Sequence, residues 1–221
     1  RQYHGLELTS EVRQHIDALQ SEHTFTICTA HQPNVFTGYL YFIYKIIHAI
    51  NLAKECKVLY PEYNFIPVYY MGSEDNDIDE IGTFHYNETT YTWKTDQKGA
   101  CGRMKTHELK DIVQVINRTL NKDVNDEAFL MTLLEQAYDG EHTLAEATRM
   151  IVNALFGQYG LLVIDGDDVQ LKTIFKPVIR HELLFQDSQA LMVDTLSKLS
   201  SHYKVQANPR AINLFYLNEN L

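Results

Sequence analysis

The sequence predicts an α/β fold in which a parallel sheet is interrupted by an inserted lobe, and three observations support this. A β-rich segment at residues 24–30 leads through a polar turn into a long apolar helix at 38–57. Continuous apolar runs follow at 65–72 and 160–165, as is typical of strands buried on both faces of a parallel sheet. Strand, helix and strand then form a right-handed unit, whose ligands bind at the carboxyl ends of the strands.

The first two helices follow from capping signals and from apolar spacing. Residues 9–20 open with a Thr-Ser-Glu cap and continue with apolar residues at helical spacing, which predicts a short amphipathic helix. The helix at 38–57 is apolar on nearly all sides, so we expect it to be buried on most faces. Thr37 precedes it and is the expected N-cap, because its hydroxyl can accept from a backbone N–H of the first turn.

Residues 83–140 are predicted to form the inserted lobe, of the kind called a connective peptide. Alternating β-rich residues at 83–94 surround Asn87-Glu88 and predict a hairpin. Helical periodicity marks residues 107–121 and 126–138. We therefore expect a small α/β lobe between two halves of one core.

The two halves of the core are assigned to residues 1–82 and 141–221. In the second half, capping signals and apolar spacing predict helices at 143–158, 168–185 and 187–201. Further strands are predicted at 204–207 and 212–217.

The polar turn after the first strand is the first candidate site. Free N–H groups and the dipole at a helix N-terminus together favour an anion. Tyr41 and Lys45 share a helix face that begins at the turn, so both side chains can reach a ligand there unless Lys45 extends into solvent. An ordinary solvated βα turn is the alternative. The candidate residues are His31, Gln32, Asn34, Thr37, Gly38, Tyr41 and Lys45.

An acidic loop follows the second strand and, if the strands are adjacent, faces the polar turn. It does not fit a calcium-binding EF-hand, because Glu80 and Tyr86 stand where that loop requires glycine and glutamate. We expect its carboxylates to bind hydroxyls, an amine, or Mg²⁺ held with a nucleotide, while a solvated charged loop is the alternative. A second acidic turn follows the third strand. The candidates from both are Ser73, Glu74, Asp75, Asp77, Asp165, Gly166 and Asp167.

Composition and missing motifs exclude several classes of protein. The formal charge of −10 argues against nucleic acid as a partner, because phosphate binding requires clustered Lys and Arg. No G-x-G-x-x-G, G-x-x-x-x-G-K-[ST] or G-x-S-x-G sequence occurs, and neither does an apolar run long enough to cross a membrane. The three cysteines lack paired spacing, so we expect free thiols in a reducing cytoplasm. No histidine spacing favours a metal site.

Four stretches together resemble the BshC family, the cysteine-adding enzymes of bacillithiol synthesis. They are His31–Gly38 with Tyr41 and Lys45, Pro67–Asp77 with Asp79-Glu80, Tyr159–Asp165, and Asn213–Phe215. The resemblance spans most of the chain. It implies a Rossmann-like core with connective-peptide lobes, and a C-terminal coiled coil through which longer family chains form homodimers.

The resemblance also implies a reaction, the joining of cysteine to the amine of glucosaminyl malate, with activation by ATP. Two positions differ from the family. Asn76 stands where the family commonly has His, and His31 stands where it usually has Gln. Of those two residue types at position 31, only His titrates near neutral pH.

A synthetase-like scheme gives most of the candidates a role. His31, Thr37, Gly38 and nearby N–H groups would hold phosphate, with Lys45 adding positive charge. Glu74, Asp75 and Asp77 would orient the amine or the sugar hydroxyls, or hold Mg²⁺. Asp165 and Asp167 would close the other side of the site, at a ribose.

Two other functions remain open from the sequence alone. One is a non-catalytic module that binds a small metabolite or a partner. The other is a metal-dependent hydrolase that uses the acidic loops, which the absence of suitably spaced histidines disfavours.

Overall fold

The structure is a computed structural model that describes residues 2–199, 203–206 and 208–216. Its contacts divide the chain after Gly166 into two compact units. The first unit contains the sheet and the predicted lobe, and the second contains two long helices. Each unit is described by itself below.

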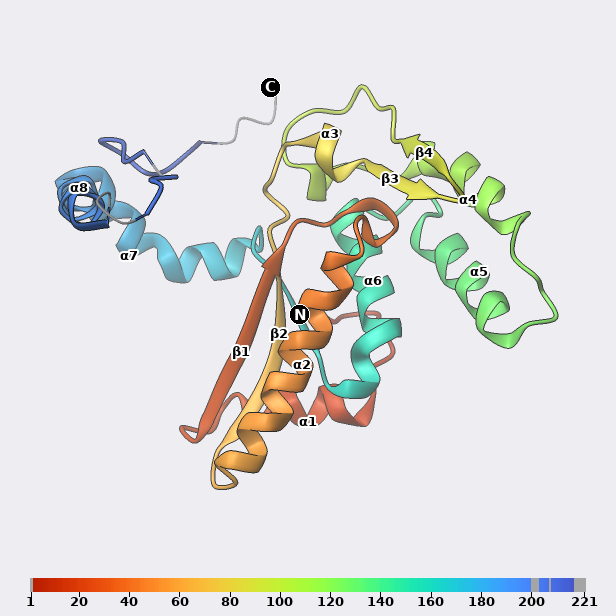
Figure 1. Ribbon diagram of the computed structural model, residues 1–221, viewed down its shortest axis with the longest axis horizontal. Coiled ribbons are helices and arrows are strands. Elements are labelled where there is room, and N and C mark those ends of the chain that lie inside the picture. The colour runs from red at the N-terminus through yellow and green to blue at the C-terminus, as the bar shows by residue number, and fades with distance from the viewer. Residues whose placement is uncertain (1, 200–202, 207, 217–221) are drawn as a thin grey trace. The chain divides into compact units, whose positions relative to one another are not determined.

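A parallel sheet forms the centre of the first unit (Figure 1). Its strands are β1 (Thr24–His31), β2 (Asn64–Met71) and β5 (Leu162–Asp165), in the order β1-β2-β5. The register places His31 opposite Met71, and Met71 opposite Asp165, so the three strands end together. The predicted α/β fold and its three parallel strands are confirmed.

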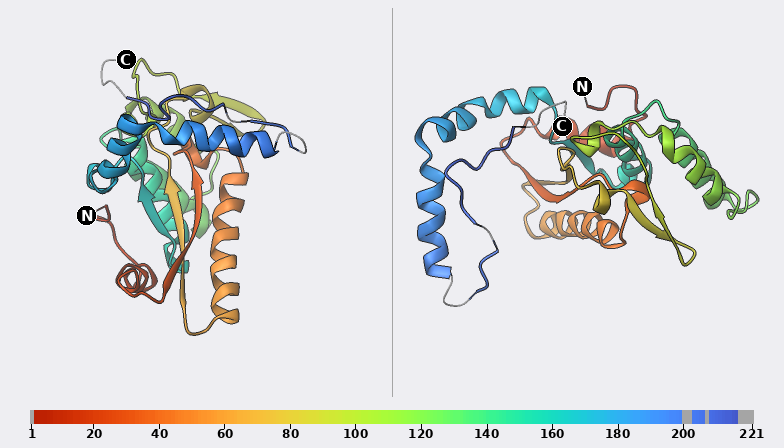
Figure 2. Two further views of the ribbon diagram at one scale, coloured as in Figure 1. Left: turned by 90° about the vertical axis from the view of Figure 1, so that its left-hand side faces the viewer. Right: turned by 90° about the horizontal axis from the view of Figure 1, so that it is seen from above.

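Helices cover both faces of this sheet, as the apolar strands required. Odd-numbered side chains such as Tyr69 and Met71 face α2 (Tyr41–Leu59) and α6 (Leu144–Phe156). Even-numbered side chains such as Ile66 and Val68 instead pack with α1 (Ser10–Ala18). Figure 2 shows α1 and α2 on opposite sides of the strands. The predicted helix at 9–20 is confirmed, and Thr9 accepts from the Val12 N–H as its N-cap.

Three predictions for the long helix are wrong: its start, its N-cap and its burial on most faces. The helix starts at Tyr41 rather than at Gly38, and Thr37 does not cap it, because Val35–Thr37 forms a separate 3₁₀ turn, η1. Left-handed φ values at positions 36–38 prevent the helix from beginning earlier. The helix also buries only one face, since Tyr44 and Ile47 on its other side are exposed.

The short α3 (Ile78–Ile81) precedes the predicted lobe, residues 83–140, which contains a hairpin and two helices. The hairpin pairs β3 (Thr83–Tyr86) with β4 (Thr89–Thr92) around Asn87-Glu88, as predicted, and both turn residues have positive φ. Helix α5 (Asn125–Ala137) matches its prediction. The segment predicted as one helix at 107–121 is a 3₁₀ turn, η3 (His107–Leu109), followed by α4 (Lys110–Asn117).

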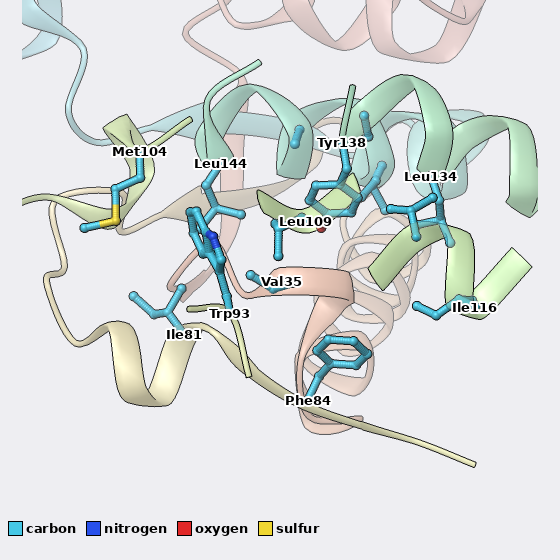
Figure 3. Packing of buried hydrophobic residues seen from close by; sticks show 14 of the residues in the cluster. Val35, Ile81, Phe84, Trp93, Met104, Leu109, Ile116, Leu134, Tyr138 and Leu144 are labelled. Atoms are coloured by element: carbon cyan, nitrogen blue, oxygen red, sulfur yellow. The ribbon is translucent and has the colours of Figure 1, made fainter. Parts of the chain in front are cut away.

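Side chains of the lobe form one hydrophobic core together with residues of the polar turn and of α6 (Figure 3). Trp93, Leu109 and Tyr138 contribute to it from the lobe. Val35 of the polar turn and Leu144 of α6 belong to the same cluster. Thr143 begins α6 with a complete capping box, as its sequence predicted. The partition of the chain at residues 82 and 140 stays a prediction.

The second unit contains α7 (Val169–Phe185) and α8 (Asp187–Leu199), neither of which has a buried residue. These helices confirm the predictions as far as residue 199. The strands predicted at 204–207 and 212–217 are wrong for residues 204–206 and 212–216, which are irregular, while 207 and 217 lie outside the described residues. Within the unit, Asn213 donates to Glu182 from both its backbone and its side chain.

No helix in the described part of the chain combines the length and the apolar character needed to span a membrane.

Candidate functional site

The three strand ends place the polar turn, the acidic loop and the Asp165 turn side by side in the first unit. The Gly72 N–H donates to the His31 carbonyl at 2.9 Å, and the Gly166 N–H donates to the Met71 carbonyl at 3.0 Å. The sequence predicted this meeting, because parallel strands end at one edge of a sheet. Gly166 suits this approach, since a Cβ there would lie 2.4 Å from the Tyr70 hydroxyl.

The polar turn continues into a left-handed segment. Phe36 and Thr37 have φ values of 51° and 68°, and Gly38 has a φ of 58° with a ψ of −135°. The Thr37 and Gly38 N–H groups already donate to the Asn34 and Val35 carbonyls at 3.3 and 2.9 Å. These two N–H groups, which were expected to hold phosphate, are thus engaged inside the turn itself.

Asn34 lies inside this turn as a buried polar side chain with 2% of its surface exposed. Neither its amide nitrogen nor its amide oxygen has a hydrogen bond of standard geometry within the described residues. Its side chain packs against Gly38, where an added Cβ would lie 2.7 Å from the amide nitrogen. The Asn34 side chain also acts on the His31 imidazole as a hydrogen-bonding partner, so the two buried polar groups lie together in the turn.

Two buried tyrosine hydroxyls hold the ends of the turn, and sequence analysis missed both. Tyr69 of β2 donates toward the His31 and Gln32 carbonyls, at 3.2 and 3.1 Å. Tyr138, just after α5, accepts from the Phe36 N–H at 2.8 Å. Burial raises the pKa of both phenols far above neutrality, so both stay protonated. No local signal identifies these tyrosines, because they lie 38 and 102 positions from the groups they bind.

His31 ends β1 with only 9% of its surface exposed. Its ring lies 5.0 Å from the Tyr41 ring and 5.4 Å from the Phe42 ring, so it adjoins the first turn of α2. Burial lowers the pKa of His31, and the nearby Lys45 charge acts in the same direction, against opposing effects from Gln32, Asn34 and Glu80. At neutral pH the imidazole is therefore uncharged.

Tyr41 and Lys45 both extend from α2 toward the end of β1, as their shared helix face predicted. Lys45 is exposed, but its ammonium group donates to the Ala30 carbonyl at 2.6 Å. Tyr41 also stacks with Tyr39, at 6.2 Å between ring centroids. The site thus has one cation and an aromatic side at the start of α2.

The acidic loop is organised by its own carboxylates. Asp75 accepts from the Asp77 N–H at 3.0 Å, and Asp77 accepts from the Glu80 N–H at 3.1 Å as the N-cap of α3. The Cys101 N–H donates to the Asp75 carbonyl at 2.8 Å. Burial raises the pKa of the Cys101 thiol to about 12, helped by the charges of Asp75 and Asp77, so this cysteine stays protonated.

Gln32 connects the two loops across the site. Its amide nitrogen lies 3.5 Å from a carboxylate oxygen of Glu80, a residue that was not among the candidates. Glu74 is partly buried at the start of the acidic loop. The polar turn and the acidic loop therefore face one another, as predicted.

Asp165 closes the third side and forms polar contacts within the protein. It accepts a short hydrogen bond from the Ser73 hydroxyl, and Arg149 of α6 lies 3.4 Å from its other carboxylate oxygen. Gln2 binds both backbone groups of Asp165 and accepts from Arg149 through its carbonyl. Arg149, which is 9% exposed, was missed because an arginine inside an amphipathic helix carries no sequence signal of its partner.

Asp167 belongs to the second unit, unlike the other candidates. Its carboxylate forms an ion pair with Lys172 at 2.6 Å, one turn into α7. The expected contact of Asp167 with a ribose therefore stays a prediction.

The residues fit an anion better than a metal ion. In the part of the chain that the structure describes, no group of three or more His, Cys, Asp or Glu side chains could hold a metal ion. A phosphate-bearing ligand is a better match for the start of α2, where a helix N-terminus, the buried His31 and Asn34 side chains and the Lys45 ammonium lie together. We therefore assign no residue to Mg²⁺.

Comparisons with known proteins cover the whole chain. Residues 1–221 match the family described as "Bacillithiol biosynthesis BshC, N-terminal Rossmann-like domain". Proteins named "Putative cysteine ligase BshC" from Flavobacterium psychrophilum and Flavobacterium johnsoniae are 44% and 43% identical over 221 residues. Each match covers 100% of this chain and 41% of the relative.

A more distant relative of the same name, from Chlorobaculum tepidum, is 29% identical over 215 residues. That match covers 92% of this chain and 38% of the relative. The chain thus spans about two fifths of the length of the curated relatives it matches.

Proposed function

This chain belongs to the BshC family, as its N-terminal Rossmann-like domain, and on that premise we propose that the whole protein is a cysteine ligase of bacillithiol biosynthesis. The ligase joins the carboxylate of cysteine to the amine of glucosaminyl malate and forms an amide bond. The observation that carries the proposal is the meeting of the polar turn and the acidic loop at one edge of a parallel sheet. The full protein acts in the cytoplasm as a homodimer that forms through a C-terminal coiled coil.

Formation of an amide from a carboxylate requires activation of that carboxylate and then attack by the amine. ATP, when bound, supplies the activation. The start of α2 favours its negative charge through the helix dipole, and Lys45 adds a positive charge beside the end of β1. The neutral His31 imidazole donates from Nδ1 to the Gln32 carbonyl at 3.2 Å, which leaves Nε2 to accept a hydrogen bond from a ligand without adding charge.

The acidic loop supplies negative charge and hydrogen-bond acceptors for the amine substrate. Asp75 uses one carboxylate oxygen to accept from the Asp77 N–H. A carboxylate has acceptor capacity beyond a single bond, so Asp75 can also orient the amine or the sugar hydroxyls of glucosaminyl malate. The amine and the activated carboxylate are then held on facing loops.

The direct test is to incubate full-length protein with cysteine, glucosaminyl malate, ATP and Mg²⁺ and to analyse the products by mass spectrometry. The amide conjugate together with AMP or ADP is the expected result. Consumption of a substrate without conjugate would instead indicate a hydrolase. Binding without any product would indicate a non-catalytic module.

Asp75→Asn tests the acidic loop within the full-length protein. Asparagine keeps a side-chain oxygen that can accept from the Asp77 N–H, so the loop should stay folded while the charge is lost. We expect ligation to be abolished and the circular dichroism spectrum to be unchanged. Asp111→Asn, on the exposed side of α4, removes one charge elsewhere and should ligate normally. Normal ligation by Asp75→Asn would remove the acidic loop from the mechanism.

A further inference from the structure

The strained part of the polar turn depends on the lobe. Phe36 and Thr37 are non-glycine residues in the left-handed region, and Thr37 is β-branched, which makes that conformation unfavourable. Such residues persist only where the surrounding structure fixes them. Phe36 makes its side-chain and N–H contacts with residues far away in the sequence, Phe84 and Tyr138. These contacts are therefore candidates for what fixes the left-handed conformation.

Lobe residues hold Phe36 through both its backbone and its ring. The Phe36 N–H donates to the Tyr138 hydroxyl at 2.8 Å. The Phe36 ring lies 4.6 Å, between centroids, from the rings of both Tyr138 and Phe84. Tyr138 is 1% exposed and belongs to the lobe core shown in Figure 3, next to Val35. The hydroxyl is thus fixed in place and does not adapt to the turn.

We propose that Tyr138 is a positioning residue of the candidate site, whose hydroxyl fixes the left-handed turn at Phe36 and thereby places Asn34 and the start of α2. The inference rests on the proposed function for its catalytic consequence. Tyr69 holds the opposite end of the turn by donating to the His31 and Gln32 carbonyls. The turn is therefore held between the sheet and the lobe by two buried hydroxyls, one acting as donor and the other as acceptor.

Tyr138→Phe removes only the hydroxyl and leaves the ring that packs against Phe36. Tyr86→Phe is the matched control, because the Tyr86 hydroxyl also makes a hydrogen bond in the lobe, with Thr119 at 2.6 Å, away from the turn. In full-length protein we expect amide hydrogen exchange at Thr37 and Gly38, whose N–H groups donate to carbonyls within the turn, to accelerate about tenfold in Tyr138→Phe alone. We expect kcat/KM for ligation to fall about tenfold in the same variant, with an unfolding midpoint close to that of Tyr86→Phe.

The outcomes separate this inference from the proposed function. Faster exchange with unchanged kcat/KM would show that the turn does not serve the reaction, and unchanged exchange would show that Tyr138 does not hold it. Either result overturns the proposal. If wild-type protein forms no conjugate, the proposed function fails, and exchange at Thr37 and Gly38 still decides whether Tyr138 holds the turn. Tyr69→Phe repeats the test from the other end, with faster exchange expected in residues 32–38.

Discussion

The two loops that face each other across the site are fixed in different ways. In the acidic loop, Ser73–Glu80, distant residues hold the first half through the Cys101 and Gly102 N–H groups, whereas the second half is organised by its own side chains, since Asp75 and Asp77 accept from N–H groups two and three residues ahead. The polar turn, His31–Gly38, is instead fixed by Tyr69 and Tyr138, which are far away in the sequence. The locally fixed half of the acidic loop, Asp75–Glu80, should tolerate change elsewhere better than the polar turn, which depends on both the sheet and the lobe.

The largest effect is expected from Gly38→Ala in the polar turn. Alanine strongly disfavours a φ of 58° with a ψ of −135°, and its Cβ would lie 2.7 Å from the Asn34 side chain. We expect the free energy of unfolding to fall by about 3 kcal/mol, as measured by urea denaturation. Ligation should be lost with it, because the turn would have to change shape.

Gly5→Ala is the control that separates backbone strain from crowding. Gly5 also has a positive φ, of 84°, but a Cβ there would meet no atom within 4 Å. We expect a loss of only about 1 kcal/mol for this variant. Equal losses in the two variants would mean that Asn34 moves aside at no cost, and the turn would then be less constrained than its contacts indicate.

A smaller effect is expected in the acidic loop, where one local contact is replaced. Asp77→Ala removes the N-cap of α3 and should lower the free energy of unfolding by about 1 kcal/mol. Asp77→Asn keeps a capping oxygen and should cost only a few tenths of that amount. Urea denaturation of both variants measures the difference. If asparagine destabilises the chain as much as alanine, the charge of Asp77 and not its cap holds the loop.

The same contrast explains what the sequence could and could not predict. The strands, the facing loops and the capping box at Thr143 depend on apolar runs and on residues a few positions apart, so they could be read directly. The left-handed turn could not, because Thr37 looks like an ordinary helix cap until distant tyrosines are placed beside it. Arg149 was missed for the same reason, since its partner Asp165 is sixteen residues away.

The smallest effect is expected from the pH dependence of His31, which probes the buried side of the polar turn. Burial lowers the pKa of this imidazole, so the folded chain binds its proton less readily than the unfolded chain, whose imidazole has a pKa of about 6.5. Between the folded-state pKa and about 6.5, the unfolded chain therefore binds more protons. The free energy of unfolding should stay level above that window and decrease as the pH falls through it.

His31→Gln removes this titration and places a neutral amide at the same position. Urea denaturation from pH 7.5 to about pH 5 should show wild-type protein losing stability relative to the variant as the pH falls, with the exposed His48→Gln as the control. A constant difference across that range would mean that the imidazole is as well solvated in the folded chain as in the unfolded one. His31 would then resemble the exposed residues Asp77 and Glu80 of the acidic loop, and the contrast between the two loops would no longer hold at His31.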